Sequence, residues 1–358
     1  MKILLHDTTL YGPPSPFFVE GLQLLKKSHR CDYEFVDLAE FLRPLQKSLV
    51  HKIGYRILGR RPLTYWALNR AMLESARRLR PDLLIVCKGA YVAPDTLKSI
   101  KAETGATLIN YATDDPFNPL VSNSSLVESV SIYDLFATTK RAIIEDLKKA
   151  GCKNIVYIQF AYQPSVHFPE APATAQERAR FESDVVFLGG CDADRIPFFE
   201  ALVRAFPDLR LHLYGGYWQR HPTLRRYARG MAVGRDYRLA LSGSAIALNL
   251  VRRANRDGHV MRTFEIPACG AFMLAERTDE HRELFDEGRE AAYFSSPDEM
   301  VEQVGFYLAH PSLRKQIGDA GYRKVTSGRH TYTDRLLQMI AAAGAPAPLA
   351  DEYIRATF

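Results

Sequence analysis

Short apolar runs alternate with stretches of helical spacing along most of the chain. Ten runs have strand length: Lys2–Leu5, Tyr33–Val36, Asp82–Val86, Leu108–Tyr111, Leu135–Thr138, Ile155–Tyr157, Asp184–Leu188, Arg210–Tyr214, Ala245–Leu250 and Ala271–Ala275. The segments between them, such as Phe17–Lys27 and Arg141–Ala150, show helical spacing. This rhythm predicts parallel sheets covered by helices, an α/β architecture of the doubly wound type. Loops at the carboxyl ends of such strands face the ligand crevice, so we single out the residues that follow each run.

The length and composition predict two domains of a globular protein. A chain of 358 residues is too long for one ordinary core. The net charge of +6 suits an anionic ligand but does not by itself indicate nucleic acid. The five cysteines are scattered without a Cys-x-x-Cys pair, which predicts a reduced, cytoplasmic protein. No window is apolar enough for a signal peptide or a membrane span.

The stretch Arg262–Glu276 gives the clearest local prediction of structure and of a ligand. Pro267 fits the first turn of a helix, so we expect a helix that starts near Arg262–Ile266 and stops at Gly270. The free amides of a helix start and of the preceding loop suit a diphosphate. Glu265, one turn in, can accept both hydroxyls of a ribose. The alternative is that Glu265 is only a carboxylate favoured by the helix dipole.

The run Arg-Thr-Phe-Glu-Ile-Pro-Ala-Cys-Gly-Ala-Phe at 262–272 resembles the donor-site segment of GT-B-type glycosyltransferases. In particular it resembles the spore-maturation-type subgroup of group 1. The likeness runs from about Asp184 to Leu336, and in the first half it depends mainly on Thr113-Asp114-Asp115-Pro116. It implies two Rossmann-like domains that face a cleft, at 1–165 and 166–340, and a tail at 341–358 that packs back on the first domain. Where many retaining members carry a second glutamate this chain has Asp257, which leaves inversion or retention open.

The resemblance also implies a donor site in the second domain. Glu265 would hold the ribose, Arg195 and Arg262 would neutralise the diphosphate, and amides of Gly258–Met261 would cradle it. Gly189-Gly190 permits close backbone approach, and main-chain groups of the Gly230–Gly234 turn, which by itself reads as a short strand, would contact the base. The predicted donor residues are Gly189, Gly190, Arg195, Met231, Val233, Gly258, His259, Met261, Arg262, Thr263 and Glu265.

We predict no metal ion and no cofactor beyond the donor substrate. The Asp-x-Asp at Asp192-Ala193-Asp194 precedes a helix and is interpreted as an N-cap. Arginines with bidentate geometry on phosphate oxygens would substitute for the metal.

The candidate catalytic residues lie in the first domain, where two apolar runs end in Lys88 and in Asp114-Asp115-Pro116. One aspartate is expected to cap the turn, and the other to bind the acceptor hydroxyl or act as base. Asp115 directly precedes the proline and is held extended, so Asp114 is the favoured base. Lys88 either holds an anionic group or pairs with that aspartate.

Residues 41–73 contain no acidic residue and interleave cations with aromatics: Arg43, Lys47, Lys52, Tyr55, Arg56, Arg60, Arg61, Tyr65, Trp66 and Arg70. Such a segment suits peripheral contact with a membrane surface or an acidic acceptor. The alternative is a solvated helix face whose side-chain stems pack down. A second arginine-rich segment, 209–235, has too few stacking aromatics for a nucleic-acid site.

The function that these patterns and the resemblance imply is metal-independent transfer of a sugar from a nucleotide diphosphate sugar, of the hexosyltransferase type. The acceptor, whether glycan, lipid-linked group, protein or small molecule, is not specified. Two alternatives stay open: a nucleotide-sugar 2-epimerase on the same scaffold, and a GT-B module that binds without catalysis.

Overall fold

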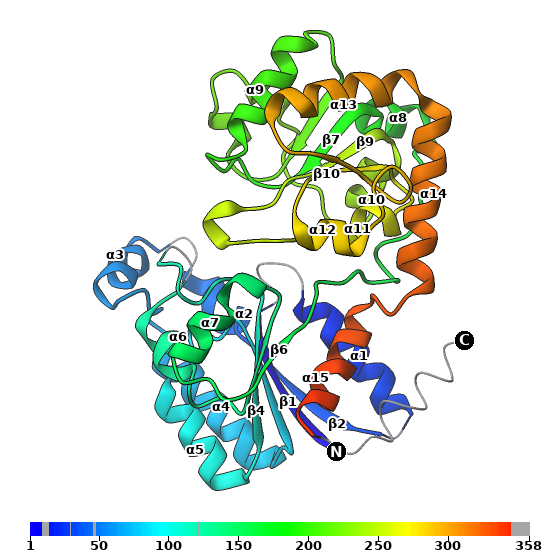
Figure 1. Ribbon diagram of the computed structural model, residues 1–358. Coiled ribbons are helices and arrows are strands. Elements are labelled where there is room, and N and C mark those ends of the chain that lie inside the picture. The colour runs from blue at the N-terminus through cyan, green and yellow to red at the C-terminus, as the bar shows by residue number, and fades with distance from the viewer. Residues whose placement is uncertain (9–13, 29, 46–47, 120–121, 345–358) are drawn as a thin grey trace. The chain divides into compact units, whose positions relative to one another are not determined.

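The computed structural model describes residues 1–8, 14–28, 30–45, 48–119 and 122–344 (Figure 1). The chain forms two compact units, Phe160–Thr331 on one side and Met1–Gln159 with the chain from Tyr332 onward on the other. Residues 332–340, which we expected in the second domain, therefore belong to the first unit, and residues 160–165, which we expected in the first domain, belong to the second. Most of the predicted tail lies outside the described residues.

The return of the chain to the first unit has a packing cause. Helix α15 (Tyr332–Ala342) packs against helix α1 (Ser15–Lys27), and the ring of Tyr332 lies 5.2 Å from that of Phe17 and 5.6 Å from that of Phe18. Gly21 makes the approach possible, since a Cβ there would lie 3.1 Å from Thr333 Oγ1. Tyr332 is fully buried by these contacts.

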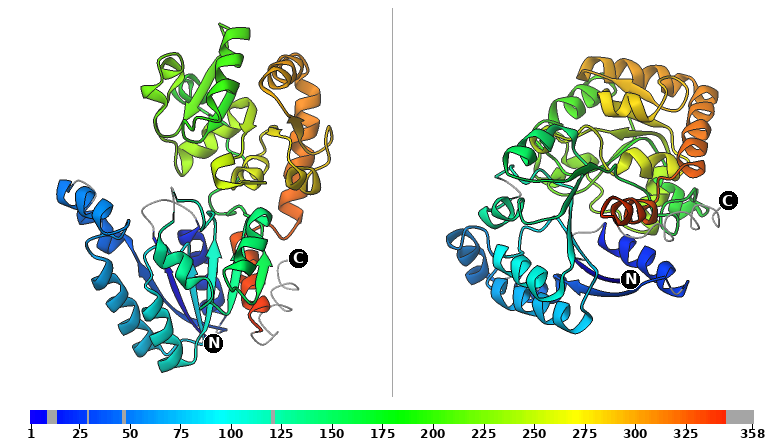
Figure 2. Two further views of the ribbon diagram at one scale, coloured as in Figure 1. Left: turned by 60° about the vertical axis from the view of Figure 1, so that its left-hand side comes forward. Right: turned by 60° about the horizontal axis from the view of Figure 1, so that its bottom comes forward.

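The first unit is built on a six-stranded parallel sheet in the order β2-β1-β3-β4-β5-β6. Its strands are β1 (Lys2–Asp7), β2 (Asp32–Asp37), β3 (Leu83–Cys87), β4 (Thr107–Ala112), β5 (Leu135–Thr138) and β6 (Ile155–Tyr157). β3 is buried at every residue, as expected for a strand covered on both faces. The pair α1–α15 and the pair α4 (Tyr65–Leu79) with α5 (Pro94–Thr104) cover opposite faces (Figures 1 and 2).

Shorter helices complete the first unit: α2 (Ala39–Leu42), η1 (Arg43–Leu45), α3 (Leu49–Ile57), α6 (Ser124–Ser129), η2 (Arg141–Ile143) and α7 (Ile144–Lys149). The single helix predicted over Arg141–Ala150 is thus a 3₁₀ turn followed by a short α-helix. It stops at Gly151, which takes the positive φ of +85° that the sequence predicted.

The second unit holds a five-stranded parallel sheet in the order β11-β10-β9-β7-β8. Its strands are β7 (Ser183–Leu188), β8 (Leu211–Tyr214), β9 (Ser244–Asn249), β10 (Met273–Glu276) and β11 (Ala292–Phe294). Its helices are α8 (Ala175–Phe181), α9 (Ile196–Ala205), η3 (Trp218–Arg220), η4 (Arg225–Tyr227), α10 (Arg235–Ser242), η5 (Arg253–Asn255), α11 (Arg262–Ala268), α12 (Asp279–Leu284), α13 (Pro297–Ala309) and α14 (Pro311–Ser327). Two apolar clusters, one with Phe187 and one with Phe264, form its core.

Both sheets reverse their strand order beside their first strand. In the first unit β1 lies between β2 and β3, and in the second β7 lies between β8 and β9. Ligands of doubly wound sheets bind outside the carboxyl ends of the strands at this switch point. The predicted doubly wound α/β class is confirmed. The two switch points are the expected positions of ligand-binding residues.

Candidate functional site

The switch point of the second sheet begins with two facing glycine turns. The Gly189 amide donates to Tyr214 O at 2.8 Å, and the Cys191 amide donates to Gly216 O at 3.0 Å. Gly215 has φ of +130°, and a Cβ on it would lie 2.3 Å from Gly189 O, so only glycine fits. The predicted Gly189-Gly190 turn is therefore held rigidly at the carboxyl end of β7.

Arg195 joins the two loops of this switch point. Its side chain is buried and donates to Gly190 O at 3.2 Å, to Asp192 Oδ2 at 2.7 Å and to Leu250 O at 3.4 Å. Gly190 follows β7 and Leu250 follows β9. The guanidinium therefore positions the loops as well as carrying charge.

The N-cap interpretation of Asp192–Asp194 is wrong. Helix α9 has Arg195 at its N-cap position and no side-chain cap. Asp194 Oδ2 instead accepts the amide of Arg253 at 2.9 Å, and Asp192 pairs with Arg195. The bond of Asp192 to Arg195 has a charge on both partners, whereas a cap bond to a backbone amide has a charge on the carboxylate only, so the ion pair is favoured.

Three guanidinium groups gather here, and we call Arg195, Arg252 and Arg262 the arginine cluster. Arg195 and Arg262 lie over the ring of Phe187, at 5.3 and 5.8 Å from its centroid. Arg252 Nε is 3.6 Å from Asp192 Oδ2. Burial, followed by the charge of Arg262, lowers the pKa of Arg195 to about 10, although Asp192 opposes the shift. Like charges thus crowd together, with the carboxylates of Asp192 and Asp194 near them.

Arg262 is the least satisfied member of the arginine cluster. It forms no hydrogen bond or ion pair with any residue that the structure describes, and its Nε atom is buried. Arg195 and Arg252 also have a buried Nε atom that finds no hydrogen-bond partner among the described residues. Buried donors without hydrogen bonds are costly, and N–H donors of this kind suit an anion.

Helix α11 carries Arg262 and Glu265 largely as predicted. It starts at Arg262, and Gly270 takes φ of +71° just beyond its end. Pro267, however, lies inside the helix and not in its first turn. The helix tolerates the missing donor because it ends one residue later and loses a single interior hydrogen bond.

Glu265 is buried and already has partners within its unit. Tyr237 Oη donates to Oε2 at 2.6 Å, and His167 Nε2 lies 3.7 Å from Oε1. His167 Nδ1 accepts the amide of Gln163, so its proton sits on Nε2 and points toward the carboxylate. Burial and the charge of Glu265 raise the pKa of Tyr237, which keeps the phenol a donor. Glu265 therefore ties α10 and the segment 160–169 to α11, whatever else it binds.

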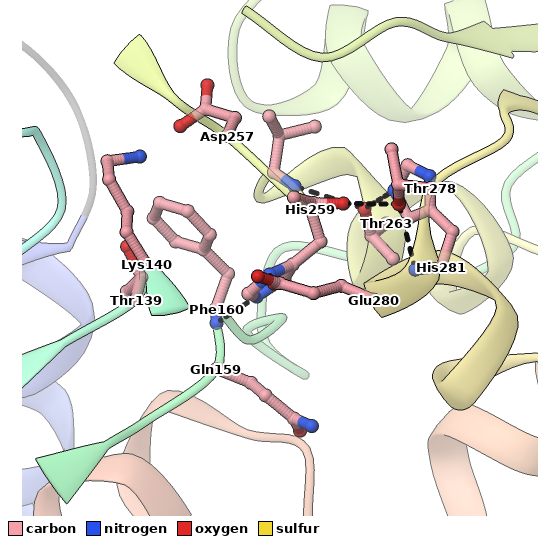
Figure 3. Close-up of polar contacts among 12 residues, drawn as sticks. Thr139, Lys140, Gln159, Phe160, Asp257, His259, Thr263, Thr278, Glu280 and His281 are labelled. Carbon is pink, nitrogen blue, oxygen red and sulfur yellow. Dashed lines mark hydrogen bonds and ion pairs between the residues drawn. The ribbon is translucent and has the colours of Figure 1, made fainter. Parts of the chain in front are cut away.

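The loop before α11 is fixed by its own side chains (Figure 3). His259 is fully buried; its Nε2 accepts the Phe160 amide at 3.0 Å, so its Nδ1 carries the proton that it donates to Glu280 Oε2 at 2.5 Å. Thr278 Oγ1 donates to Gly258 O at 2.6 Å, and a Cβ on Gly258 would lie 2.3 Å from Glu280. These contacts hold the loop against α12 and the residue before it.

Thr263 serves the same loop from α11. Its Oγ1 accepts the amide of Val260 at 3.2 Å and lies 2.9 Å from His281 Nε2 (Figure 3). The side chains of His259 and Thr263 therefore point into the unit, and Met261 is partly buried. What this loop offers a ligand is its backbone.

The predicted base-contacting turn lies beside the end of β8. Gly230 O accepts the amide of Gly215 at 2.7 Å, which places the turn next to the glycine turns. Gly230 and Gly234 both have positive φ, and the residues between them form a loop and not a short strand. Met231 and Val233 are 68% and 72% exposed.

At the switch point of the first sheet the predicted catalytic residues come together. Lys88 Nζ is 3.3 Å from Asp114 Oδ2, and Lys88 itself has φ of +61°, an uncommon conformation for a residue with a side chain. Asp115 Oδ1 accepts the amide of Phe117 at 2.9 Å. Asp115 thus closes the turn, and Asp114 is the aspartate that meets Lys88.

Asp7 is a further acidic group here, which the sequence predicts only as the start of a candidate cleft loop or turn, Asp7–Tyr11, whose last three residues lie outside the described residues. It ends β1, and burial raises its pKa although Lys88 opposes the shift. Its Oδ2 atom is buried without a hydrogen-bond partner among the described residues. The sequence contained a sign of this buried carboxyl group, because an acidic residue at the end of an otherwise apolar strand is unusual. Tyr237 and His167 gave no such signal.

Two features are absent from the described residues. No group of three or more His, Cys, Asp or Glu side chains there is placed to hold a metal ion. In the same part of the chain no helix combines the length and the apolar character needed to cross a membrane.

Comparison with known proteins supports this architecture. Residues 195–341, less than half of the chain, match a sequence family described as glycosyl transferase-like. No curated protein matches significantly.

Solved structures match over nearly the whole chain. HepE of Anabaena in complex with UDP-glucose is 11% identical, with 96% of this chain and 99% of that one covered and a TM-score of 0.63. Sucrose-phosphate synthase of Thermosynechococcus elongatus is 11% identical, with coverages of 95% and 97% and a TM-score of 0.67. A glycosyltransferase of Rickettsia africae is 12% identical, with 98% of both chains covered and a TM-score of 0.62. These likenesses show the fold, two Rossmann-like domains of GT-B type.

Proposed function

We propose that this protein is a glycosyltransferase of group 1 type that takes its sugar from a nucleotide diphosphate sugar. The observation that carries the proposal is Arg262, a cation with a buried Nε and no hydrogen-bond or ion-pair partner among the described residues, beside buried Arg195 at the switch point of the second sheet. The match of residues 195–341 to a glycosyl transferase-like family supports it. So does a fold shared with a protein whose structure holds UDP-glucose, which favours a hexose donor.

In this proposal the arginine cluster receives the diphosphate. When the bond between sugar and phosphate breaks, negative charge develops on the leaving phosphate. Guanidinium N–H groups that are already positioned and partly desolvated stabilise this charge more than water does. Arg262 has no hydrogen bond or ion pair with a described residue that a phosphate would have to replace, whereas Arg195 is fixed by its bonds to the two loops. The cluster would supply the positive charge that a metal ion supplies elsewhere.

The remaining contacts to the donor would come from other loops at the carboxyl edge of the second sheet. Amides of Gly258–Met261 and of the Gly189-Gly190 turn would approach the phosphates, and main-chain groups of Met231–Val233 would contact the base. Glu265 would accept the ribose hydroxyls. A carboxylate offers about four lone-pair sites. The hydrogen bond that Glu265 accepts from Tyr237 therefore leaves other lone pairs that can accept the ribose hydroxyls. The spore-maturation-type subgroup is the subgroup that we propose, on the run at 262–272.

The acceptor would meet the first unit at Asp114. If the reaction inverts, Asp114 removes the acceptor proton, and Lys88 holds the carboxylate in place at 3.3 Å. If it retains, Asp114 orients the acceptor hydroxyl. Asp115 supports the turn in both cases.

Calorimetric titration of the full chain with UDP, GDP and dTDP tests the proposal, followed by mass spectrometry of the matching donor sugars with candidate acceptors. We expect micromolar to millimolar binding of one nucleotide and slow release or transfer of its sugar. Isomerised sugar would indicate the epimerase, and binding without turnover the silent module. Absence of binding to all three nucleotides would remove the donor site.

A further inference from the structure

Helix α3 presents its apolar side to solvent. Leu49, Val50, Ile53 and Ile57 are 70%, 70%, 53% and 76% exposed. With 3.6 residues per turn these four positions fall on one side of the helix, within about 100° of arc. A surface helix of a globular protein normally turns such an apolar stripe toward the core. Helix α3 instead turns its apolar stripe toward solvent.

The opposite side of α3 holds it to the unit. Tyr55 Oη lies 3.2 Å from Tyr91 Oη, and the two rings pack edge to face with centroids 6.4 Å apart. The ring of His51 packs on Tyr55 at 5.8 Å. A Cβ on Gly54 would lie 2.8 Å from Leu63 Cδ2, so Gly54 packs closely against the Leu63 side chain. The helix is thus anchored through its polar and aromatic side, which fixes the apolar side outward.

The surroundings of this apolar side are basic and aromatic. Trp66, at the start of α4, is 74% exposed, and Leu58 and Leu63 are 46% and 43% exposed. None of Arg56, Arg60 and Arg61 forms an ion pair with a described residue. Arg61 donates only to serine hydroxyls, with Nη2 2.8 Å from Ser125 Oγ. No acidic residue occurs between positions 41 and 73. The positive charge of these three arginines, not ion-paired with any described residue, therefore flanks a band of exposed aliphatic groups, and the acidic side chains of Asp95 and Glu128 line a pocket with Arg61 and Trp66.

We propose that α3 and Trp66 dock on an anionic lipid bilayer surface. The aliphatic band of Leu49, Val50, Ile53 and Ile57 would enter the boundary between headgroups and acyl chains, and the arginines would meet the lipid phosphates. Exposed tryptophan favours the same depth. A second copy of the chain fits poorly, because a symmetric contact would bring the unpaired arginines of both copies together. This surface does not depend on the proposed function.

Vesicle binding of the full chain provides the test. The chain has two tryptophans, and Trp218 is fully buried, so a change in emission on adding vesicles reports Trp66. We expect vesicles of phosphatidylcholine with 30% phosphatidylglycerol to blue-shift the emission and to sediment the protein. Pure phosphatidylcholine vesicles should bind at least tenfold more weakly, and 0.5 M NaCl should weaken binding to the anionic vesicles.

Two variants and two controls locate the surface. Ile53→Ser with Ile57→Ser should weaken binding at least tenfold while circular dichroism and nucleotide affinity stay unchanged, because both side chains are exposed. Leu24→Ser, at a 44% exposed leucine on α1 of the same unit, should bind like the wild type. Trp66→Phe should abolish the emission shift while sedimentation persists.

Four outcomes would overturn the proposal. These are no binding to anionic vesicles, equal binding to neutral and anionic vesicles, wild-type binding by the double variant, and an equal loss in Leu24→Ser. Concentration-dependent dimerisation that the double variant abolishes would assign the surface to a second copy instead.

Discussion

The carboxyl edges of the two sheets have the same topology and opposite charge. At the first edge the carboxyl groups of Asp7 and Asp114 both interact with Lys88, whose Nζ lies 3.3 Å from Asp114 Oδ2. At the second edge the arginine cluster outnumbers its one paired carboxylate, Asp192. Both edges adjoin a switch point between the first strand and its two neighbours.

The difference suggests a division of labour on one scaffold. An excess of guanidinium groups suits a diphosphate, which carries negative charge and gains more as it leaves. An excess of carboxylates repels a diphosphate and suits a hydroxyl that must lose a proton. The fold alone does not assign these roles, because both units share it. We propose the roles from the charges at the two edges, and the following experiments test this proposal.

The largest effect is expected at the first edge. Asp114→Asn keeps the shape of the side chain and removes the base, so we expect kcat to fall by about 10²–10⁴-fold if the reaction inverts. The dissociation constant of the donor should stay unchanged, because the donor belongs to the other edge. Steady-state kinetics and calorimetry on the same preparation measure both quantities.

Asp115→Asn is the matched control for Asp114. Its carboxylate accepts the Phe117 amide, so the change should lower thermal stability slightly and leave kcat near the wild-type value. Near-normal turnover in Asp114→Asn, or a defect confined to donor binding, would leave the first edge without a named catalytic residue.

The next largest effect is expected at Arg262. Arg262→Gln removes charge-assisted hydrogen bonds to the diphosphate, each worth about 1.5–3 kcal/mol, so affinity for the preferred nucleotide should fall by about ten- to a hundredfold. Stability should not change, because Arg262 makes no hydrogen bond with the described residues. Calorimetry and thermal melting separate the two readouts.

Arg253→Gln serves as the control for charge alone. Arg253 lies on the same stretch of chain, but its side chain is 63% exposed and pairs with Glu276 at 3.0 Å. Its loss should change nucleotide affinity by less than about threefold at physiological salt, since exposed charges are screened. Equal losses in both variants would mean that net charge, and not the arginine cluster, attracts the nucleotide.

Glu265 should show a smaller effect, and its buried neighbour allows a sharper test. Glu265→Gln removes charged acceptors of the ribose, and we expect affinity to fall by about tenfold. Tyr237→Phe deletes the phenol that donates to Glu265 at 2.6 Å and should lower stability while affinity stays unchanged. If both variants lower stability and neither changes affinity, Glu265 only ties α10 to α11.

The two units should resemble one another in their response to acid. Burial lowers the pKa of His6 in β1 and of His281 in α12 to about 4. Unfolded histidine titrates near 6.5, so between about pH 6.5 and 4 the unfolded chain binds more protons. Stability should therefore fall as the pH falls through this window, by up to about 1.4 kcal/mol per pH unit for each histidine. Melting from pH 7 to 4.5 measures the slope, which His281→Gln should reduce. An unchanged slope would contradict the assignment.

The fold could be predicted because most of its strands are continuous apolar runs. All ten predicted strands are present, since strands covered on both faces leave this pattern in the sequence. The missed strand β11 has only three residues and leaves no pattern of its own. The orientation of α3 could not be predicted either. Its spacing shows that the helix is amphipathic, but Tyr91, far along the chain, decides which side faces the unit.

The sites could be predicted only where they are local in sequence. Arg262 and Glu265 share one short segment, and Lys88 and Asp114 each follow an apolar run. The partners of Glu265 come from elsewhere; Tyr237 is 28 residues away, and no spacing rule connects the two. Similarly, Asp192 and Asp194 look like caps until the structure brings Arg195 and the Arg253 amide to them.

The smallest effect is expected from chelation, and it tests the charge at the second edge directly. If the arginine cluster neutralises the leaving diphosphate, the reaction needs no divalent ion, and turnover in 5 mM EDTA should equal that in buffer. The reason is local. A guanidinium aligned on a phosphate oxygen supplies positive charge and N–H donors in the same place where Mg²⁺ would bind. The same assay on Arg262→Gln is a second test. Because this variant has one cation fewer, added Mg²⁺ should restore part of the turnover rate that it has lost. Loss of wild-type turnover in EDTA, recovered by Mg²⁺ or Mn²⁺, would mean that the excess of arginines serves binding and not neutralisation of the leaving group.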